Sequence, residues 1–580
     1  MTTTYDTPAA APLAPTSGNE RIAALDVIRG FALIGILLMN IEFFNRYTGD
    51  AGMGIQQGIS GASLWFSYFV QYFVTGKFWT IFSMLFGMGF AVMLLRAKSA
   101  ERSFLGPYLR RIVALAVFGV LHYILLWNGD ILFGYATAAA GLLIALYGRL
   151  KYILLSMLSF GALSALPGMG WCLAVVGGIA FSGLLAWFLR CDDRITVFKR
   201  SVPIFKIVVG ILMTASVVGI LIGLFMPDLP RQARVMTPVM GGVVLVLSIL
   251  MARYHHPADA RPLRLGVGLY CVTMLMLTIA GAVQFYLPAP DDVLVQKMPA
   301  AVSVSAAAKP VTTAPAAAKP APGTPAKKQT QAERVAEKKQ KLDKMLAERQ
   351  AEKELELRVL TTGSYLEVIT MRAKRFVKDA PDQIAFAIEI IAMFLIGLWF
   401  VRSGVMANTS AHLPLFRKLA FIALPIGVGL GLAGARIATF ATPDMANGFM
   451  FATGLLMLGN LPASLGYIAL VVLLLHSRPP FSRIAILAPY GRMALTNYLT
   501  HSLVFSFVFY GYGLGYFGIE RIWQLACVCA MVLVQIPLSH LWLSRFRYGP
   551  MEWLWRAITY WRLPAMRIAP ADHAGDTRPA

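Results

Sequence analysis

Stretches of 18 or more predominantly apolar residues recur along this chain, and they constrain the fold more than any other feature. A run of that length crosses the hydrocarbon core of a bilayer as a single helix. Charged residues make up only 14% of the sequence, against about a quarter in ordinary soluble domains. The sequence therefore predicts an all-α, polytopic integral membrane bundle of about 12–14 transmembrane helices.

The distribution of Lys and Arg predicts how the chain is oriented. The formal net charge is +23, which in a soluble protein would suggest nucleic acid as a partner. Here the basic residues fall mostly in short loops between apolar runs, such as RAKSAERSFLGPYLRR and HSRPPFSR. Basic residues in short loops stay on the cytoplasmic side of a membrane. We therefore expect two cytoplasmic termini and the lipid bilayer, with no nucleic acid, as the partner.

Changes in composition divide the chain into six parts. We expect a disordered tail at 1–20, an N-terminal transmembrane half at 21–200, an additional transmembrane module at 201–288, an extracytoplasmic linker and charged helix at 289–358, a C-terminal transmembrane half at 359–562 and a disordered tail at 563–580. The Ala, Pro and Lys repeats of the linker predict an extended, disordered segment. The following QAERVAEKKQKLDKMLAERQAEKELELR predicts a solvated helix.

The first apolar run, RIAALDVIRGFALIGILLMN, carries polar residues along one helix face. At about 100° per residue, Asp26, Arg29 and Asn40 fall within roughly 60° of one another. Polar groups inside a membrane usually face a protein interior or a water-filled cavity. One interpretation is an ion pair that locks this helix to a neighbour. The other is that Arg29, held by Asp26, meets an anionic ligand from the cytoplasm, because its planar fork suits phosphate.

A histidine is embedded in the run FGVLHYILLWNGDIL. His122 is either a core histidine bonded to a neighbouring helix or a general base, since imidazole titrates near neutral pH. Arg111 lies on nearly the same helix face, toward the cytoplasmic end. Asp130 follows in the outer loop, where a carboxylate could orient the imidazole.

Polar residues also crowd the start of a later span, in APYGRMALTNYLTHS. Arg492, Thr496, Asn497 and His501 predict either a cavity-lining helix or a structural hydrogen-bond network. The five cysteines of the chain show no metal-ligand spacing, and no nucleotide, serine-hydrolase or metalloprotease motif is present. We therefore expect no metal site and no permanently bound cofactor.

Six segments, in order along the chain, carry a family resemblance. They are LDVIRGFALIGILLMNI, FWTIFSMLFGMGF, RRIVALAVFGVLHYILLWNGDILFGYA, GSYLEVITMR, GRMALTNYLTHS and YGPMEWLWR. Together they resemble the YeiB-like family, whose C-terminal half is catalogued as domain of unknown function 418. The resemblance covers residues 20–150 and 360–560, and it implies a multi-pass protein of the bacterial inner membrane.

The N-terminal half is similar, more distantly, to transmembrane acyltransferases of the heparan glucosaminide acetyltransferase type. That resemblance implies that Asp26, Arg29 and Gly30 mark the cytoplasmic end for an acyl-CoA donor and that Asn40 lies near the reacting centre. Those enzymes place a catalytic histidine soon after the residue equivalent to Asn40. Here IEFFNRYTGDAG contains none, so His122 is the substitute.

The leading hypothesis is an acyltransferase that moves an acyl group from cytoplasmic acyl-CoA, as a co-substrate, to an extracytoplasmic glycan, lipid or small molecule. Arg29, Arg110 and Arg111 would attract the CoA phosphates. His122 would act as general base and Asn40 would stabilise the oxyanion.

Two alternatives use the same sequence features differently. The polar helices could line the path of a transporter or flippase for a small molecule or envelope precursor. The chain could also be a non-catalytic envelope scaffold, in which 289–358 reaches a periplasmic partner.

Overall fold

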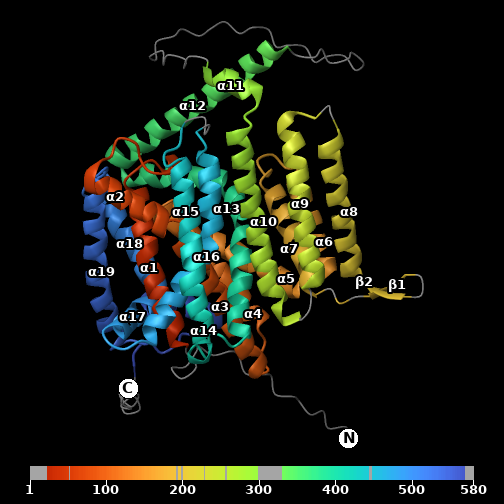
Figure 1. The fold of residues 1–580 in the computed structure, drawn as a ribbon. Helices are drawn as coiled ribbons and strands as arrows, with labels where there is room; N and C mark the ends of the chain where they lie inside the picture. Colours follow the sequence, from red (N-terminus) through yellow and green to blue (C-terminus); the bar gives the residue numbers. More distant parts are fainter. Residues whose placement is uncertain are drawn as a thin grey trace.

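The computed structural model describes residues 22–50, 52–190, 192, 194–197, 200–226, 229–254, 258–297, 330–442 and 447–568. These residues form a bundle of long helices, with one helix lying across an end of it (Figure 1). Eleven helical segments in this part of the chain are long and apolar enough to cross a membrane, and two shorter apolar helices accompany them. The prediction of an all-α, multi-pass membrane bundle is confirmed.

Gly, Pro and charged loops separate the helices. The N-terminal half comprises α1 (Ala23–Phe44), α2 (Gly61–Phe69), α3 (Lys77–Ser99), α4 (Leu105–Leu121), α5 (Leu132–Tyr147), α6 (Leu150–Leu163) and α7 (Cys172–Arg190). Two short antiparallel strands, β1 (Arg194–Val197) and β2 (Arg200–Pro203), lead to α8 (Ile204–Phe225), α9 (Arg231–Arg253), α10 (Arg261–Tyr286) and α11 (Pro290–Lys297). The remainder comprises α12 (Gln331–Thr362), α13 (Tyr365–Arg402), α14 (Leu413–Lys418), α15 (Leu424–Ile437), α16 (Phe449–Leu475), α17 (Leu487–Arg492), α18 (Ala494–Phe509), α19 (Arg521–Leu543) and α20 (Pro550–Tyr560).

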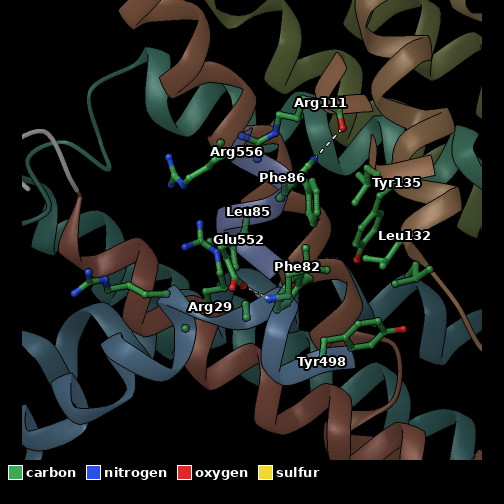
Figure 2. Close-up of a pocket in the computed structure, with 18 of the residues that line it drawn as sticks. Arg29, Phe82, Leu85, Phe86, Arg111, Leu132, Tyr135, Tyr498, Glu552 and Arg556 are labelled. Carbon is green, nitrogen blue, oxygen red and sulfur yellow. Dashed lines mark hydrogen bonds between the residues drawn. The ribbon is translucent and has the colours of Figure 1, made fainter. Parts of the chain in front are cut away.

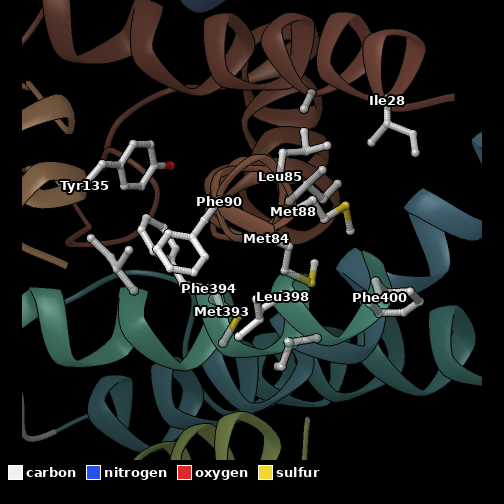
Figure 3. Close-up of a cluster of buried hydrophobic side chains, with 14 of the residues drawn as sticks. Ile28, Met84, Leu85, Met88, Phe90, Tyr135, Met393, Phe394, Leu398 and Phe400 are labelled. Atoms are coloured by element: carbon white, nitrogen blue, oxygen red, sulfur yellow. The ribbon is translucent and has the colours of Figure 1, made fainter. Parts of the chain in front are cut away.

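The contact between α3 and α13 forms the centre of the bundle, where buried Met, Leu and Phe side chains pack together (Figure 3). Two glycines lie at the crossing. A Cβ on Gly397 would come within 2.0 Å of the Met84 carbonyl oxygen, and one on Gly87 within 2.2 Å of the Phe394 carbonyl oxygen. Small residues at such positions allow two backbones to approach closely inside a membrane. This crossing fixes α3, which lines the candidate site described below.

The three spans of the additional module differ in how deeply they are built into the bundle. α10 packs against α13 and α16, and a Cβ on Gly281 would come within 2.5 Å of the Phe451 backbone nitrogen. α8 and α9 lie at the edge of the bundle beside α10 (Figure 1). Only 17% and 11% of their apolar windows are buried, against 67% for the span of α13. Most of the α8–α9 surface is therefore left to face lipid.

The start of the predicted disordered linker is instead helical. α11 occupies Pro290–Lys297, and its two aspartates pair with α12. Arg334 Nε lies 3.3 Å from Asp291 Oδ2, and Lys338 pairs with Asp292. Acidic residues in a first turn favour a helix N-terminus. The prediction of a disordered linker rested on its overall Ala, Pro and Lys content, which does not show this local pattern. The rest of the expected linker, residues 298–329, lies outside the described residues.

The charged helix α12 is a single helix, as predicted, but it is not solvated on all sides. Arg349 Nη2 and Lys353 Nζ lie 3.0 and 3.2 Å from the carboxylate of Asp50, in the loop after α1. Glu356, only 2% exposed, accepts hydrogen bonds from the backbone nitrogen and hydroxyl of Thr48 at 2.9 and 2.5 Å. These three α12 residues recur at helical spacing, so one face of α12 is docked on the membrane bundle.

The predicted span at 485–511 is divided into two helices, α17 and α18, which meet at Met493. The break has a local cause. The carboxylate of Glu552 accepts hydrogen bonds from the backbone nitrogens of Leu495 and Thr496, at 2.6 and 3.1 Å. A carboxylate at this position caps the N-terminus of α18 as a separate helix.

The expected C-terminal tail begins later than predicted. Residues 563–568 return to the bundle, where the Arg547 nitrogen donates to the Met566 carbonyl at 2.9 Å and the Ile568 nitrogen to the Arg545 carbonyl at 3.2 Å. A hairpin-like pairing of this kind is not visible in composition. Residues 569–580, and the expected N-terminal tail at 1–20, lie outside the described residues.

Candidate functional site

Two adjoining chambers, each of about 180 Å³, open into the bundle from the end where α1 begins. We call the chamber nearer the start of α1 the arginine chamber. The arginines that line it are Arg29, Arg96, Arg111, Arg492, Arg547 and Arg556. We call the other the inner chamber, and its lining includes Phe82, Phe86, Leu132, Tyr135, Tyr498 and Trp555 (Figure 2). Both chambers share Arg29, Arg111, Arg492, Glu552 and Arg556 in their walls.

The arginine chamber is strongly positive. Six guanidinium groups face only two carboxylates in its lining, those of Asp26 and Glu552. Asp26 Oδ1 accepts a hydrogen bond of 2.6 Å from Arg29 Nη1, so the predicted pair exists and fixes Arg29 at the chamber wall. Arginine clusters in a partly enclosed cleft focus a positive potential and suit phosphate groups. The chamber is thus equipped to bind an anion.

Glu552 belongs to the structure of the chamber. Besides capping α18, its carboxylate accepts a hydrogen bond of 2.6 Å from the Thr496 hydroxyl. Burial raises the pKa of this carboxyl group, while its hydrogen bonds oppose that shift. These bonds join α20 to α18.

Arg111 lies where the two chambers meet. Its guanidinium carbon is 4.2 Å from the centre of the Trp555 ring, and the Trp555 indole nitrogen donates to the Arg111 carbonyl at 3.0 Å. Stacking on an indole holds a guanidinium by a cation–π interaction while leaving its edge donors available. Arg111 therefore keeps a defined orientation between α4 and α20.

The inner chamber changes from charged to apolar with depth. Aromatic rings make up much of its wall, with Phe86 and Tyr135 4.6 Å apart and Phe86 and Trp555 6.4 Å apart between ring centres. Figure 2 shows Tyr135 and Leu132 on the opposite side of the cavity from Arg29 and Arg556. A cavity with a charged mouth and an apolar interior fits a ligand with an anionic head and an apolar tail.

Tyr498 and Ile131 are part of the wall of the inner chamber. The Tyr498 ring lies 5.1 Å from the imidazole of His122, between ring centres. Ile131 directly follows Asp130. The wall of the chamber therefore adjoins the residues that carry the predicted acid–base chemistry.

His122 is the central member of a three-residue array. Its Nδ1 lies 2.8 Å from Asp130 Oδ1, and its Nε2 lies 2.8 Å from the hydroxyl oxygen of Ser502. Asp130 is in turn fixed by the Phe133 backbone nitrogen, which donates to Oδ2 at 2.9 Å. The side chains of His122 and Asp130 are 1% and 0% exposed. Hydroxyl, imidazole and carboxylate follow one another in the order of a serine–histidine–aspartate triad.

Local backbone geometry positions this array. α4 ends at Leu121, and the chain continues into a π turn, His122–Leu126, before the loop that holds Asp130. Such wide turns re-aim side chains and occur frequently at functional sites. Ser502 comes from α18, one turn after Tyr498, so a single face of α18 supplies both the chamber wall and the hydroxyl.

Asn40 continues the face of α1 that lines the cavity. Arg29 and Ile36 contribute to the inner chamber, and Asn40 follows Ile36 by one helical turn. It is buried, at 8% exposure. Within the described residues no hydrogen bond joins it to His122, whose two ring nitrogens lie against Asp130 and Ser502.

Four other predicted site residues line neither chamber. Arg110 donates to the Thr559 carbonyl at 3.0 Å, and Thr496 is bonded to Glu552. Asn497 donates to Ser539, and His501 lies 2.7 Å from Gln535 Oε1, which ties α18 to α19. Of the residues predicted to line a cavity in this segment, Arg492 does so.

Sequence reasoning did not assign Ser502 to the site. It appears in the polar run GRMALTNYLTHS, which was the available signal. Its partner lies 380 positions earlier, and neither residue belongs to a GxSxG or similar local motif. The sequence prediction also did not include Arg96 of α3 and Arg556 of α20. These two arginines lie far apart in the sequence and come together only in the folded bundle.

Comparison with known proteins now places the chain. Residues 400–562 match the family described as "Protein of unknown function (DUF418)". The chain is 24% identical to the uncharacterized protein YxaH of Bacillus subtilis (strain 168) over 557 residues, which is 94% of this chain and 96% of that protein. It is 34% identical to the uncharacterized protein YeiB of Escherichia coli (strain K12) over 175 residues, 30% of this chain and 44% of YeiB.

The C-terminal region is a DUF418 domain. The chain is thus similar to YeiB and YxaH, as the six sequence segments predicted. No solved structure matches it significantly. The DUF418 region supplies α17, α18 and α20, and with them Ser502, Arg492 and Glu552, whereas the N-terminal half supplies His122 and Asp130. The candidate site is therefore shared between the two halves of this membrane protein.

Proposed function

We propose that this protein is an acyltransferase of the bacterial inner membrane, which transfers an acyl group from cytoplasmic acyl-CoA to an extracytoplasmic hydroxyl or amine. One observation carries the proposal. The arginine chamber and inner chamber form a path from a cationic mouth to a wall that touches a Ser–His–Asp array. The more distant likeness to transmembrane acyltransferases stays a prediction.

The arginine chamber supports donor binding. An acyl-CoA carries its phosphates at one end and its thioester at the other, joined by an extended arm. Arg29 and Arg111 would bind phosphates at the mouth while the arm follows the aromatic wall inward. Along α1, Arg29 and Asn40 are eleven residues apart, or about 16 Å at 1.5 Å per residue, so the thioester must travel well into the bilayer.

The array supports nucleophilic catalysis by Ser502. With Nδ1–H donating to Asp130, Nε2 of His122 accepts the Ser502 proton as the hydroxyl oxygen attacks the thioester carbonyl carbon. The C–S bond breaks, and the departing thiolate receives that proton from His122. An acceptor hydroxyl or amine then attacks the acyl-serine, gives its proton to His122, and Ser502 regains a proton as it leaves.

Asn40 and the surroundings of the array complete the proposal. The Asn40 amide, on the outer part of the same α1 face, would donate to the oxyanion as it forms. Burial of His122 and Asp130 excludes water, which protects an acyl-serine from hydrolysis. His122 is therefore proposed to act on Ser502 first and on the acceptor second, rather than on the acceptor alone.

The test is to mix purified full-length protein with acetyl-CoA and to measure its intact mass and the acylated peptide. Wild-type protein should gain one acetyl group on Ser502, and His122→Gln and Ser502→Ala should not. Asn497→Ala, in the same helix but in the α18–α19 network, should still be acylated. A folded, monodisperse protein that neither binds acetyl-CoA nor gains an acetyl group would reject the proposal. Substrate flux in proteoliposomes without acyl-CoA would favour a transporter instead.

A further inference from the structure

A separate polar cavity, of about 320 Å³, lies at the opposite end of α1 from the arginine chamber and the inner chamber. We call it the outer pocket, and its principal lining residues are Glu42, Asn45, Ser63, Ser67, Arg521 and Gln524. They come from the end of α1, from α2 and from the start of α19. Glu42 follows Arg29 by thirteen residues, or about 20 Å along the helix. The outer pocket therefore belongs to the extracytoplasmic side if the basic loops are cytoplasmic.

Buried polar side chains distinguish the outer pocket from an ordinary surface hollow. Five of its lining residues are almost inaccessible: Asn45 at 6%, Ser63 at 8%, Ser67 at 6%, Arg521 at 6% and Gln524 at 5% exposure. Burying polar groups costs free energy unless they are bonded. A cluster of this kind around a cavity indicates a site in which the donors and acceptors are arranged for a ligand.

Hydrogen bonds fix these side chains in place. Asn45 Oδ1 accepts from the Gly518 nitrogen at 3.2 Å, the Ser67 hydroxyl donates to the Ser63 carbonyl at 2.9 Å, and the Gln524 amide donates to the Ile519 carbonyl at 3.1 Å. Each bond joins a side chain of the pocket to the backbone. The lining is therefore preorganised, which reduces the entropy that a ligand must offset.

Arg521 provides the feature that points to the ligand's chemistry. Its Nη1 donates to Gln524 Oε1 at 2.6 Å, and its Nη2 lies 3.0 Å from Glu42 Oε2. Its Nε is buried without a hydrogen bond to the described residues, and Nη2 has only the ion-pair contact with Glu42, without hydrogen-bond geometry. These two nitrogens form one edge of the guanidinium, the edge that binds a carboxylate or phosphate through two parallel hydrogen bonds.

The charge balance of the outer pocket selects between these anions. Two arginines, Arg46 and Arg521, are offset by two glutamates, Glu42 and Glu520, in its lining. Glu42 already pairs with both arginines. A singly charged carboxylate that approaches the Nε and Nη2 edge of Arg521 meets the Glu42 carboxylate beside Nη2, at a smaller electrostatic cost than a dianion would. A doubly charged phosphate ester would be repelled more strongly by the nearby glutamates.

We propose that the outer pocket binds a small hydroxylated carboxylic acid. The carboxylate would take the Nε and Nη2 edge of Arg521, and the serine hydroxyls and side-chain amides would bond the ligand's hydroxyl groups. This site does not depend on the proposed acyl transfer. On α1, Phe44 turns away from the pocket and stacks on Trp127, 4.4 Å between ring centres, and Trp127 in turn lies beside His122.

Isothermal titration of full-length protein in nanodiscs tests the proposal, with D-glucuronate as the probe. D-Glucose serves as the uncharged control ligand, and D-glucose 6-phosphate serves as the dianionic control ligand. We expect a Kd for glucuronate of about 0.1–1 mM. The two control ligands should bind at least about tenfold more weakly. Arg521→Gln should raise the glucuronate Kd about tenfold or more, whereas His122→Gln and the exposed-site control Arg545→Gln should leave it unchanged.

A second variant guards against misfolding of the first. Ser67→Ala removes one lining hydroxyl without adding any atom to this buried side chain, and it should raise the Kd about threefold or more, the loss of one modest hydrogen bond. Absence of binding to wild-type protein at 10 mM glucuronate, on the order of ten times the upper expected Kd, would overturn the proposal. Equal affinity for glucose, tighter binding of the phosphate, or an unchanged Kd in folded Arg521→Gln would overturn it as well.

Discussion

The Nε2 atom of His122 and the hydroxyl oxygen of Ser502 lie 2.8 Å apart, although the two residues belong to different halves of the chain. His122 follows the end of α4, and Ser502 belongs to α18 of the DUF418 domain. The contact makes the chemistry of one half depend on the placement of the other. It also gives the proposed acyl transfer a reacting pair whose members can be varied one at a time.

Asp130→Asn should slow acylation of Ser502 by about 10²–10⁴-fold, because an amide does not stabilise an imidazolium as a carboxylate does. The side chain keeps its size and one acceptor for the Phe133 nitrogen, so the melting temperature should change little. The measurement is the rate of acetyl-Ser502 formation by intact mass. Asp382→Asn, at an exposed position of α13, is the matched control. Wild-type rates in Asp130→Asn would remove Asp130 from the mechanism.

Arg111→Gln should raise the KM for acyl-CoA about tenfold or more and leave kcat within about threefold, because it removes a cation that binds donor phosphate in ground and transition states alike. The effect should shrink as salt rises, since chamber and donor attract each other by charge. Steady-state kinetics at two ionic strengths measure both.

Arg110→Gln provides the comparison for Arg111, since it changes the preceding residue of the same helix. Arg110 is bonded to the Thr559 carbonyl and lines neither chamber. Its KM should stay near the wild-type value, although the sequence alone grouped both arginines as donor-binding. Equal increases in KM for the two variants would mean that the arginine chamber is not the donor site.

The sequence was sufficient for the parts of the fold that depend on local hydrophobicity. The apolar run near 382–402 predicted a span, and α13 covers it as part of a longer helix, Tyr365–Arg402. The ends of helices were less predictable where a residue far away in the sequence caps them. α18 begins at Ala494 because Glu552 caps it, and nothing between 485 and 511 indicates that partner.

The candidate site was predictable only in its local pairs. Asp26 and Arg29 are three residues apart, and His122 and Asp130 are eight residues apart. Because the members of each pair are close in sequence, local helix and loop geometry was enough to predict that they could meet. Ser502 comes from a segment whose register against α4 is set by packing across the whole bundle. One sequence does not determine that register, and the same limit made Asn497 and His501 resemble cavity residues when they join α18 to α19.

Gly491→Ala should destabilise the protein, by about 1–3 kcal/mol for overpacking of this kind. A Cβ there would come within 2.0 Å of the Asp26 carbonyl oxygen and 2.5 Å of the Gly30 nitrogen. Both neighbours are backbone atoms, so α1 and α17 must separate. The shift moves Asp26 and Arg29, and acyl-CoA binding should weaken together with the melting temperature.

Gly161→Ala separates this clash from the general effect of adding a methyl group. Gly161 lies within α6, and nothing lies within 4 Å of its added Cβ. Alanine favours a helix over glycine by about 0.5–1 kcal/mol, so the melting temperature should hold or rise. Thermal unfolding in one detergent measures both variants. A Gly491→Ala protein as stable as Gly161→Ala would show that α1 and α17 are not in close contact.

Asp50→Asn should release the docked face of α12. Arg349 and Lys353 both lie within 3.2 Å of the Asp50 carboxylate, and each exposed pair of this kind contributes about 0–1 kcal/mol. Limited trypsin digestion should then cut after these two residues about three to ten times faster, since cleavage follows the population of the open form. Asp343→Asn, which removes only the Lys339 pair within α12, should leave the rate near wild type. Equal cleavage of wild-type and Asp50→Asn protein would mean that the other contacts of α12, among them those of Glu356, hold it on the bundle without Asp50.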